Sequence, residues 1–136
     1  MFLAQLNDVE KDIFLKLSSA LIRADGKLDE KEKLYVAEYC REMGIANYDL
    51  NIEVELFGLA EQICKGSSNT VKRIFLVELL ALANADGEYA KSEKNLMVQI
   101  SQKFGYGEKH LDECLKLLAE YNNISTKLNT FIQEEK

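Results

Sequence analysis

The sequence contains two Asp-Gly pairs that are each followed, after five intervening residues, by a glutamate. The residues are Asp25-Gly26 with Glu32, and Asp86-Gly87 with Glu93. This spacing matches the second half of a calcium loop of the helix–loop–helix type, in which the acid before the glycine and the final glutamate both supply oxygen ligands. Asp29 adds a carboxylate to the first segment. Such all-oxygen ligands favour Ca²⁺, Mg²⁺ or Mn²⁺ over a soft metal.

The opening half of a calcium loop is missing from both segments. Its carboxylate positions carry Leu21 and Arg23 in the first segment, and Leu82 and Asn84 in the second. One segment alone offers two or three oxygen side chains, whereas Ca²⁺ takes about 6–8 oxygens. A degenerate calcium loop of the EF-hand type is therefore an alternative only. If the two segments pack about a pseudo-twofold axis, however, their five acids converge and would hold a proton or one divalent cation.

The same acids also have a structural explanation. Asp-Gly is a common turn pair, and a glutamate in the first turn of a helix is stabilised by the helix dipole. Asp29 and Glu32 have the spacing of a capping box, whereas Ala90 takes the cap position in the second segment and leaves Glu93 without a reciprocal partner. A metal-independent structural or oligomerisation module is therefore the alternative to a cation site.

The elements that position these acids are predicted to be helices. The 136 residues include no proline and only seven glycines, and apolar residues recur at three- and four-residue intervals. We expect helices over 3–24, 29–44, 50–64, 70–85, 92–104, 108–121 and 124–134. The helix over 70–85 is apolar on almost every side and should run through the middle. Six glycines fall at helix ends, where left-handed backbone is needed, and only Gly58 lies inside a helix. These features predict an all-α, compact bundle of about seven helices.

An internal repeat organises the chain. Gly26 and Gly87 are 61 residues apart, and so are Gly44 and Gly105. At this offset, residues 11–44 align with residues 72–105, and 12 of the 34 positions are identical. We therefore expect one domain over 1–136, built from two related helix–turn–helix hairpins.

Composition excludes several classes of protein. The net charge of −6 and the absence of a basic run argue against nucleic acid and anionic membrane surfaces as partners. The most apolar stretch, residues 74–83, is too short to span a bilayer and contains Glu78. Three widely spaced cysteines are typical of reduced thiols, and the start of the chain lacks the pattern of a signal peptide. These observations predict a cytoplasmic protein.

Few residues could support catalysis. His110 is the only histidine, so one chain cannot build a histidine-rich metal site, and we expect it to be exposed. Glu78 interrupts an apolar helix and is a candidate for a carboxylate of perturbed pKa, although pairing with a lysine at the helix edge is the simpler interpretation. A deep pocket around Glu78 would favour an enzyme. Without one, no catalytic activity is expected.

The paired Ala-Asp-Gly-x5-Glu pattern resembles the TerB-like family of tellurite resistance, and it is also similar to the N-terminal domain of DjlA-type co-chaperones. The resemblance covers residues 8–121. It depends on Ala20, Leu21, Ala24, Asp25, Gly26 and Glu32, and on the repeat partners Ala81, Leu82, Ala85, Asp86, Gly87 and Glu93.

The resemblance implies a seven-helix cytoplasmic domain with an acidic surface and a role in tellurite and general stress responses. It implies action by protein association, including with a TerC-type integral membrane protein, and hence a location at the inner membrane through that partner. A homodimer is a further expectation. Carried over by position, the family's acidic residues are Asp25, Glu32, Asp86 and Glu93. Ala90 and Asn95 depart from the first hairpin's Asp29 and Leu34, so we expect weaker cation binding in the second hairpin.

Overall fold

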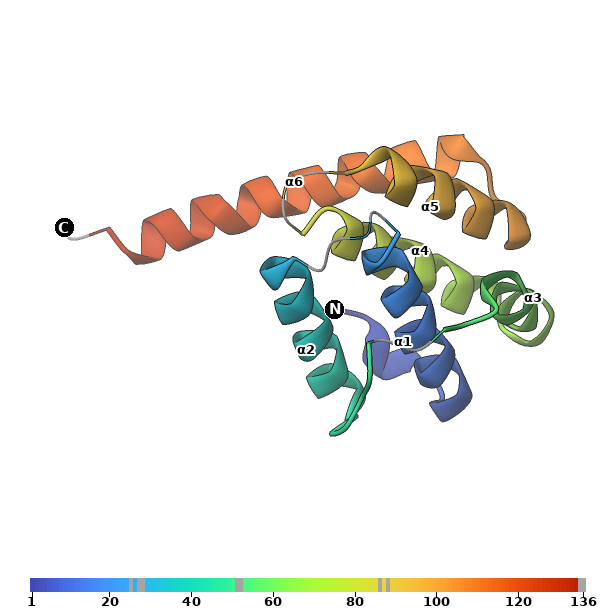
Figure 1. Ribbon diagram of the computed structural model, residues 1–136. Helices are drawn as coiled ribbons and strands as arrows, with labels where there is room; N and C mark the ends of the chain where they lie inside the picture. Colours follow the sequence, from blue (N-terminus) through green and yellow to red (C-terminus); the bar gives the residue numbers. More distant parts are fainter. Residues whose placement is uncertain (25, 27–28, 51–52, 86, 88, 135–136) are drawn as a thin grey trace.

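The described part of the chain folds as one short 3₁₀ helix followed by six α-helices (Figure 1). The computed structural model describes residues 1–24, 26, 29–50, 53–85, 87 and 89–134. The elements are η1 (Leu3–Gln5), α1 (Asp8–Ile22), α2 (Glu30–Met43), α3 (Leu56–Gly66), α4 (Asn69–Ala83), α5 (Lys91–Lys103) and α6 (Glu108–Ile132). The predicted all-α class is confirmed, with a helix count close to the seven expected.

Two hairpins form the body of the domain, α1 with α2 and α4 with α5. Both α1 and α4 have 15 residues, and their first and last residues differ by 61 in number. The second helix of each hairpin ends at a glycine in left-handed conformation, Gly44 with φ 75° and Gly105 with φ 88°. The following residues donate backward, Ile45 to the carbonyl of Cys40 at 2.8 Å and Tyr106 to that of Ser101 at 2.8 Å. This hydrogen bonding satisfies the last carbonyls of both helices.

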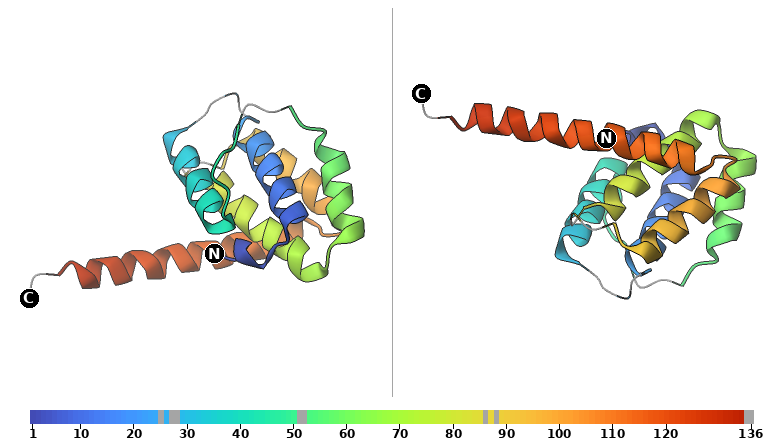
Figure 2. Two further views of the ribbon diagram at one scale, coloured as in Figure 1. Left: turned by 90° about the horizontal axis from the view of Figure 1, so that it is seen from below. Right: turned by 90° about the horizontal axis from the view of Figure 1, so that it is seen from above.

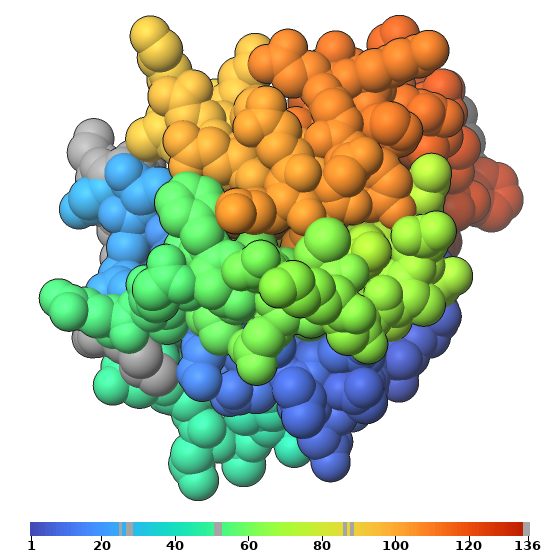
Figure 3. Space-filling model, turned by 90° about the vertical axis from the view of Figure 1, so that its right-hand side faces the viewer, coloured from blue at the N-terminus to red at the C-terminus, as the bar shows by residue number. Residues whose placement is uncertain are grey.

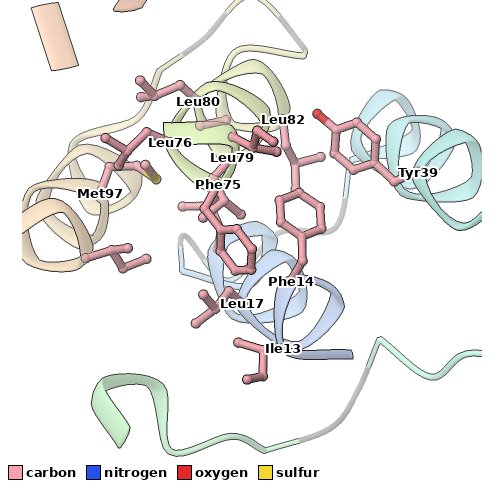
Figure 4. Close-up of a cluster of buried hydrophobic side chains, with 14 of the residues drawn as sticks. Ile13, Phe14, Leu17, Tyr39, Phe75, Leu76, Leu79, Leu80, Leu82 and Met97 are labelled. Atoms are coloured by element: carbon pink, nitrogen blue, oxygen red, sulfur yellow. The ribbon is translucent and has the colours of Figure 1, made fainter. Parts of the chain in front are cut away.

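Helix α4 lies at the centre, as its apolar sequence predicted. It contacts α1, α2, α5 and α6. Figure 4 shows Phe75 of α4 facing Phe14 of α1, with Tyr39 of α2 beside them. The rings of Phe14 and Phe75 meet edge to face at 5.3 Å, and those of Phe14 and Tyr39 do so at 5.4 Å. These contacts join both hairpins into one core.

Helix α3 connects the two hairpins and covers one side of the body. Figure 3 shows it as a green band between α1 below and α5 above. Ala60 and Ile63 are its buried side chains. At the α3 end, the hydroxyl of Ser67 donates to Glu10 Oε2 at 2.5 Å and so links α3 to the start of α1.

The predicted helix over 3–24 is divided in two. Leu6 is extended, and Asn7 begins α1 by accepting from the backbone N–H of Glu10 at 2.8 Å, while Glu10 accepts from that of Asn7 at 2.9 Å. This capping box stabilises a helix start at Asp8, and η1 takes its own direction. The break allows both Leu3 and Leu6 to be buried.

Two further predicted boundaries were wrong. The helix expected over 50–64 begins only at Leu56, because Glu55 caps it by accepting from the N–H of Gly58 at 2.5 Å. The helices expected over 108–121 and 124–134 are one continuous helix, α6, since Asn122 and Asn123 lower helix propensity without breaking the backbone. Left-handed backbone occurs at four of the six glycines that were expected to have it. Gly66 ends α3 without it, and Gly107 precedes α6 in extended conformation.

Candidate functional site

The first acidic segment lies between α1 and α2. Gly26 has φ 76°, which a residue with a side chain rarely adopts. Asp29 begins α2 by accepting from the backbone N–H of Lys31 at 2.7 Å, and its side chain is half-buried. Glu32, in the first turn of α2, is only 3% exposed. A carboxylate at that depth belongs to the packed structure of the hairpin and not to the solvated face of α2.

The second acidic segment repeats this arrangement between α4 and α5. Gly87 has φ 83°, and Glu93 is 2% exposed. Ala90 offers no side-chain acceptor, as the sequence indicated, yet Glu93 Oε1 still accepts from the backbone N–H of Ala90 at 3.3 Å. Burial raises the pKa of the neighbouring Tyr89 to about 12, and the charges of Glu93 and Asp112 add to that rise. Glu93 is therefore part helix cap and part source of a local negative field.

Both acidic segments are on the same side of the bundle. In Figures 1 and 2, the ends of α1 and α4 and the starts of α2 and α5 gather there. Asp25 and Asp86 lie outside the described residues. Within the ranges that are described, no three His, Cys, Asp or Glu side chains form a group that could hold a metal. The convergence of Asp25, Asp29, Glu32, Asp86 and Glu93 therefore stays a prediction, and the oxygen chemistry of the set suits only a hard cation.

A second polar site, which the sequence did not predict in this form, surrounds Glu78. Its side chain is 1% exposed, and Oε2 accepts from the Met1 ammonium at 2.8 Å and from the N–H of Phe2 at 3.2 Å. The lysine partner expected at a helix edge is replaced by the amino group of Met1. Glu42 supports the same segment, accepting from that ammonium at 2.9 Å and from the N–H of Leu3 at 2.7 Å. The apolar Leu3 and Leu6, both buried, were the signal in the sequence that this segment would pack on the core.

The charges of this site alter three pKa values. Burial alone would lower the pKa of the Met1 ammonium, but hydrogen bonds to Glu78 and Glu42 raise it. The pKa of Glu42 is lowered. Burial alone would raise this pKa, but hydrogen bonds from the Met1 ammonium and the Leu3 N–H lower it. The pKa of Tyr39 is strongly raised by burial and then by the charge of Glu78. The Tyr39 hydroxyl accordingly stays protonated and donates to the Glu78 carbonyl oxygen at 2.6 Å.

Two hollows border this site along the inner half of α6, residues 108–118, which we term the base of α6. The larger, of about 620 Å³, is lined by Tyr35, Glu42, Glu78 and Tyr121 among others. The smaller, of about 370 Å³, is mainly apolar and adjoins it at Leu118 and Tyr121. Glu78 thus borders a hollow, which is the observation that would favour an enzyme. Its carboxylate is nevertheless already bonded to the Met1 ammonium, so it cannot serve as a base without breaking that ion pair.

The sole histidine has a structural contact. His110 Nδ1 accepts from the backbone N–H of Gly107 at 3.2 Å, and its ring lies 5.0 Å from that of Tyr106. It is half-buried, not fully exposed as expected. His110 therefore acts as a cap at the start of α6.

These features define an all-helical domain of two hairpins around a central helix, with one buried glutamate in the first turn of each hairpin's second helix. The crystal structure of a tellurite resistance protein from Nostoc punctiforme has the same fold, with a TM-score of 0.67 and 20% sequence identity. The match covers 93% of this chain and 81% of that one. The predicted resemblance to TerB-like proteins is thus confirmed at the level of the fold.

The sequence comparisons add nothing to this match. No protein-family model matches the chain, and no curated protein matches it in sequence. Among the described helices, none is both long enough and apolar enough to cross a membrane.

Proposed function

We propose that this chain is a non-enzymatic, TerB-like stress-response domain of the tellurite-resistance type. It acts by protein association and by binding a divalent cation through Asp25, Asp29, Glu32, Asp86 and Glu93. One observation carries the proposal. Glu32 and Glu93 occupy equivalent places in the two hairpins. Each is at most 3% exposed, and each is preceded by an Asp-Gly pair.

Electrostatics supports a cation at this end of the bundle. Burial penalises an ionised carboxylate, and neighbouring carboxylates penalise one another. A divalent cation shared between the hairpins would offset both effects, and carboxylate oxygens are the ligands that Ca²⁺, Mg²⁺ and Mn²⁺ prefer. The acidic surface that the resemblance implies would suit a protein partner that carries basic side chains.

The absence of enzymatic activity is proposed on the state of Glu78. It is the buried carboxylate that borders a hollow, and the Met1 ammonium already neutralises it. A cytoplasmic location, at the inner membrane through a TerC-type protein, is proposed from the resemblance.

Calorimetric titration tests the cation. Ca²⁺, Mg²⁺, Mn²⁺ and Zn²⁺ are each titrated into the wild type, Asp25→Ala/Asp86→Ala and Glu32→Gln/Glu93→Gln. Glu30→Gln/Glu108→Gln is the matched control, since it removes two exposed carboxylates from first turns of helices. We expect binding of one hard cation by the wild type and the control, and its loss in both test variants. If none of the four proteins gives a heat of binding with any of the ions, the proposed cation site is refuted.

Two assays test association and role. In a pull-down with a TerC-type protein, Asp25→Ala/Asp86→Ala should lose the partner that the wild type retains. Expression of the wild type in a tellurite-sensitive bacterium should raise the tolerated tellurite concentration, and the same variant should not. A wild type that retains no partner and gives no tolerance would contradict this part of the proposal.

The capping contacts favour a second candidate. Asp29 and Glu93 each satisfy a backbone N–H at a helix start, as a metal-independent structural module requires. In that case the acidic substitutions lower the melting temperature but change no binding.

A further inference from the structure

The outer half of α6 has an apolar face that packs against none of the described residues. Residues 119–134 are exposed except for the half-buried Ser125, and Figures 1 and 2 show this half of α6 extending beyond the body. Its large apolar side chains are between 52% and 75% exposed. Four of them, with Leu117 just before this half, form what we term the distal stripe, which consists of Leu117, Tyr121, Ile124, Leu128 and Phe131.

The spacing of the distal stripe is that of a coiled coil. Its members alternate at four and three residues, which places them along one seam of the helix. By contrast, residues 122–130 are rich in Asn, Ser and Thr, which are poor helix formers. A helical segment of this length and composition is marginal in water unless its apolar face is packed. We therefore expect a partner to pack along the distal stripe and stabilise this helix.

Charge argues against a membrane as that partner. An interfacial helix on anionic lipid carries several Lys or Arg residues on its polar face. Between Tyr121 and Gln133 the only charged residue is Lys127. A nearly neutral segment can, however, pair with its own copy without the repulsion that a chain of net charge −6 otherwise creates.

The base of α6 supplies a matching surface on the same chain. Leu117 and Tyr121 belong to the distal stripe and also line the smaller hollow, together with Leu76, Val77 and Cys114. The stripe of one copy therefore leads directly into an apolar hollow. In an antiparallel pair, the outer half of each α6 would extend over the base of the other.

We propose that two copies of this chain associate in antiparallel fashion through α6, so that Phe131 of each copy fills the hollow at the base of α6 in the other. The register that aligns the two stripes packs Tyr121 against the second copy's Ile124, and Leu117 against the second copy's Leu128. It continues inward to place Phe131 at the level of Cys114, beside the hollow.

The flanking charges agree with this register. Glu120 and Lys127 each precede a member of the stripe, Tyr121 and Leu128, by one residue. In the antiparallel pair Glu120 of one helix faces Lys127 of the other, which gives two opposite-charge contacts by symmetry. A parallel pair would leave the hollow uncovered and would bring both bodies to the same end.

The apolar area is large enough for a stable dimer. Side chains of this size carry on the order of 150–200 Å² each, so the stripe with Ile132 exposes about 600–700 Å² per copy. Covering it on both copies removes about 1,300 Å² from water, within the range of about 1,200–2,000 Å² for stable interfaces.

Sedimentation equilibrium of the full chain tests the dimer. We expect a mass twice the 15.5 kDa of one chain for the wild type, and the mass of one chain for Ile124→Asp/Leu128→Asp. Asn123→Asp/Thr130→Asp adds the same charge to the opposite face and should remain dimeric. All three should keep the same thermal unfolding of the body, because the substituted side chains are exposed.

A charge exchange tests the orientation. Glu120→Lys and Lys127→Glu should each weaken the dimer several-fold, and the two together should restore it. A wild type of 15.5 kDa at 100 μM would overturn the proposal, as would a dimer that survives Ile124→Asp/Leu128→Asp. Sedimentation of a monomer with phosphatidylglycerol vesicles, lost in the same variant, would overturn it in favour of a membrane. Failure of the double charge exchange to restore binding would overturn the antiparallel register.

Discussion

The carboxylate of Glu78 bonds to the amino group of Met1 at 2.8 Å, across 77 residues of sequence. This contact fastens η1 against α4 and α2, and Glu42 completes it from the α2 side. A charge placed in the central helix is tolerated because the opposite charge lies beside it and the Phe2 N–H donates to the same oxygen. The Met1 ammonium thereby neutralises the carboxylate that is most buried among the described residues.

Removing this ion pair should destabilise the domain. Glu78→Gln keeps the shape of the side chain but loses the charge opposite the ammonium, so we expect the free energy of unfolding to fall by about 1–3 kcal/mol. Glu38→Gln is the control, because Glu38 lines the larger hollow together with Glu78 but is exposed and pairs with Arg41 on the surface. Urea unfolding of both variants provides the measurement. Equal stability of the two would show that the Glu78 contact contributes nothing.

The same contact predicts a pH dependence with two limbs. The pKa of Glu42 is lowered from 4.5 in the folded chain, so its stabilisation is present above pH 4.5 and is lost as pH falls through the lowered value. The pKa of the Met1 ammonium is raised from 8.0, so its stabilisation is complete below pH 8.0 and is lost as pH rises through the raised value. Melting temperatures should therefore be highest between about pH 5 and 8. In Glu42→Gln both limbs should be shallower, and unchanged limbs would contradict this account.

Tyr39 contributes a buried hydrogen bond to the same region. Tyr39→Phe keeps the ring contact with Phe14 but removes the donor to the Glu78 carbonyl, so a loss of about 1–2 kcal/mol is expected. Tyr35→Phe, on the same helix and 36% exposed, should change stability by less than about 0.5 kcal/mol. Guanidinium unfolding compares the two. A larger effect at Tyr35 would mean that the hydroxyl contact at Tyr39 is unimportant.

The second helix of each hairpin ends in backbone that only glycine adopts readily. Gly105→Ala should lower the free energy of unfolding by about 1 kcal/mol. The cost comes from the backbone, because φ is 88° there, and not from a clash, because no atom lies within 4 Å of an added Cβ. Gly66→Ala, also with open space around it but at the end of α3 in ordinary backbone, should be neutral or slightly stabilising. Thermal unfolding distinguishes the two. A destabilised Gly66→Ala would point to the loss of helix-end flexibility instead.

The thiols should differ in reactivity. Burial raises the pKa of Cys40 and of Cys114 to about 11, with Glu113 adding to the rise at Cys114. Since the thiolate is the reactive form, an aromatic disulfide reagent at pH 8 should modify the half-buried Cys64 first. Cys64→Ser should abolish the fast phase, and the other two thiols should react on unfolding. A fast phase that persists in Cys64→Ser would show that a buried thiol is accessible.

Local sequence determined much of this protein. Helical periodicity, the lack of proline and the paired glycines were sufficient to predict the all-α class, the central place of α4 and the left-handed ends at Gly44 and Gly105. These features depend on residues a few positions apart in sequence, so they can be predicted without knowledge of the fold. The Asp-Gly-x5-Glu motif likewise led to a fold resemblance that the structural match confirms.

Tertiary structure decided the rest, because burial and charge pairing depend on residues distant in sequence. The cap at Asn7 divides the predicted first helix into η1 and α1, and this break allows both Leu3 and Leu6 to be buried. The partner of Glu78 could not be found by spacing, since it is the amino group of Met1 and not a side chain. Only the packed helices show that Glu32 and Glu93 are buried alike, and that the outer half of α6 extends away from the core that its apolar residues would otherwise join.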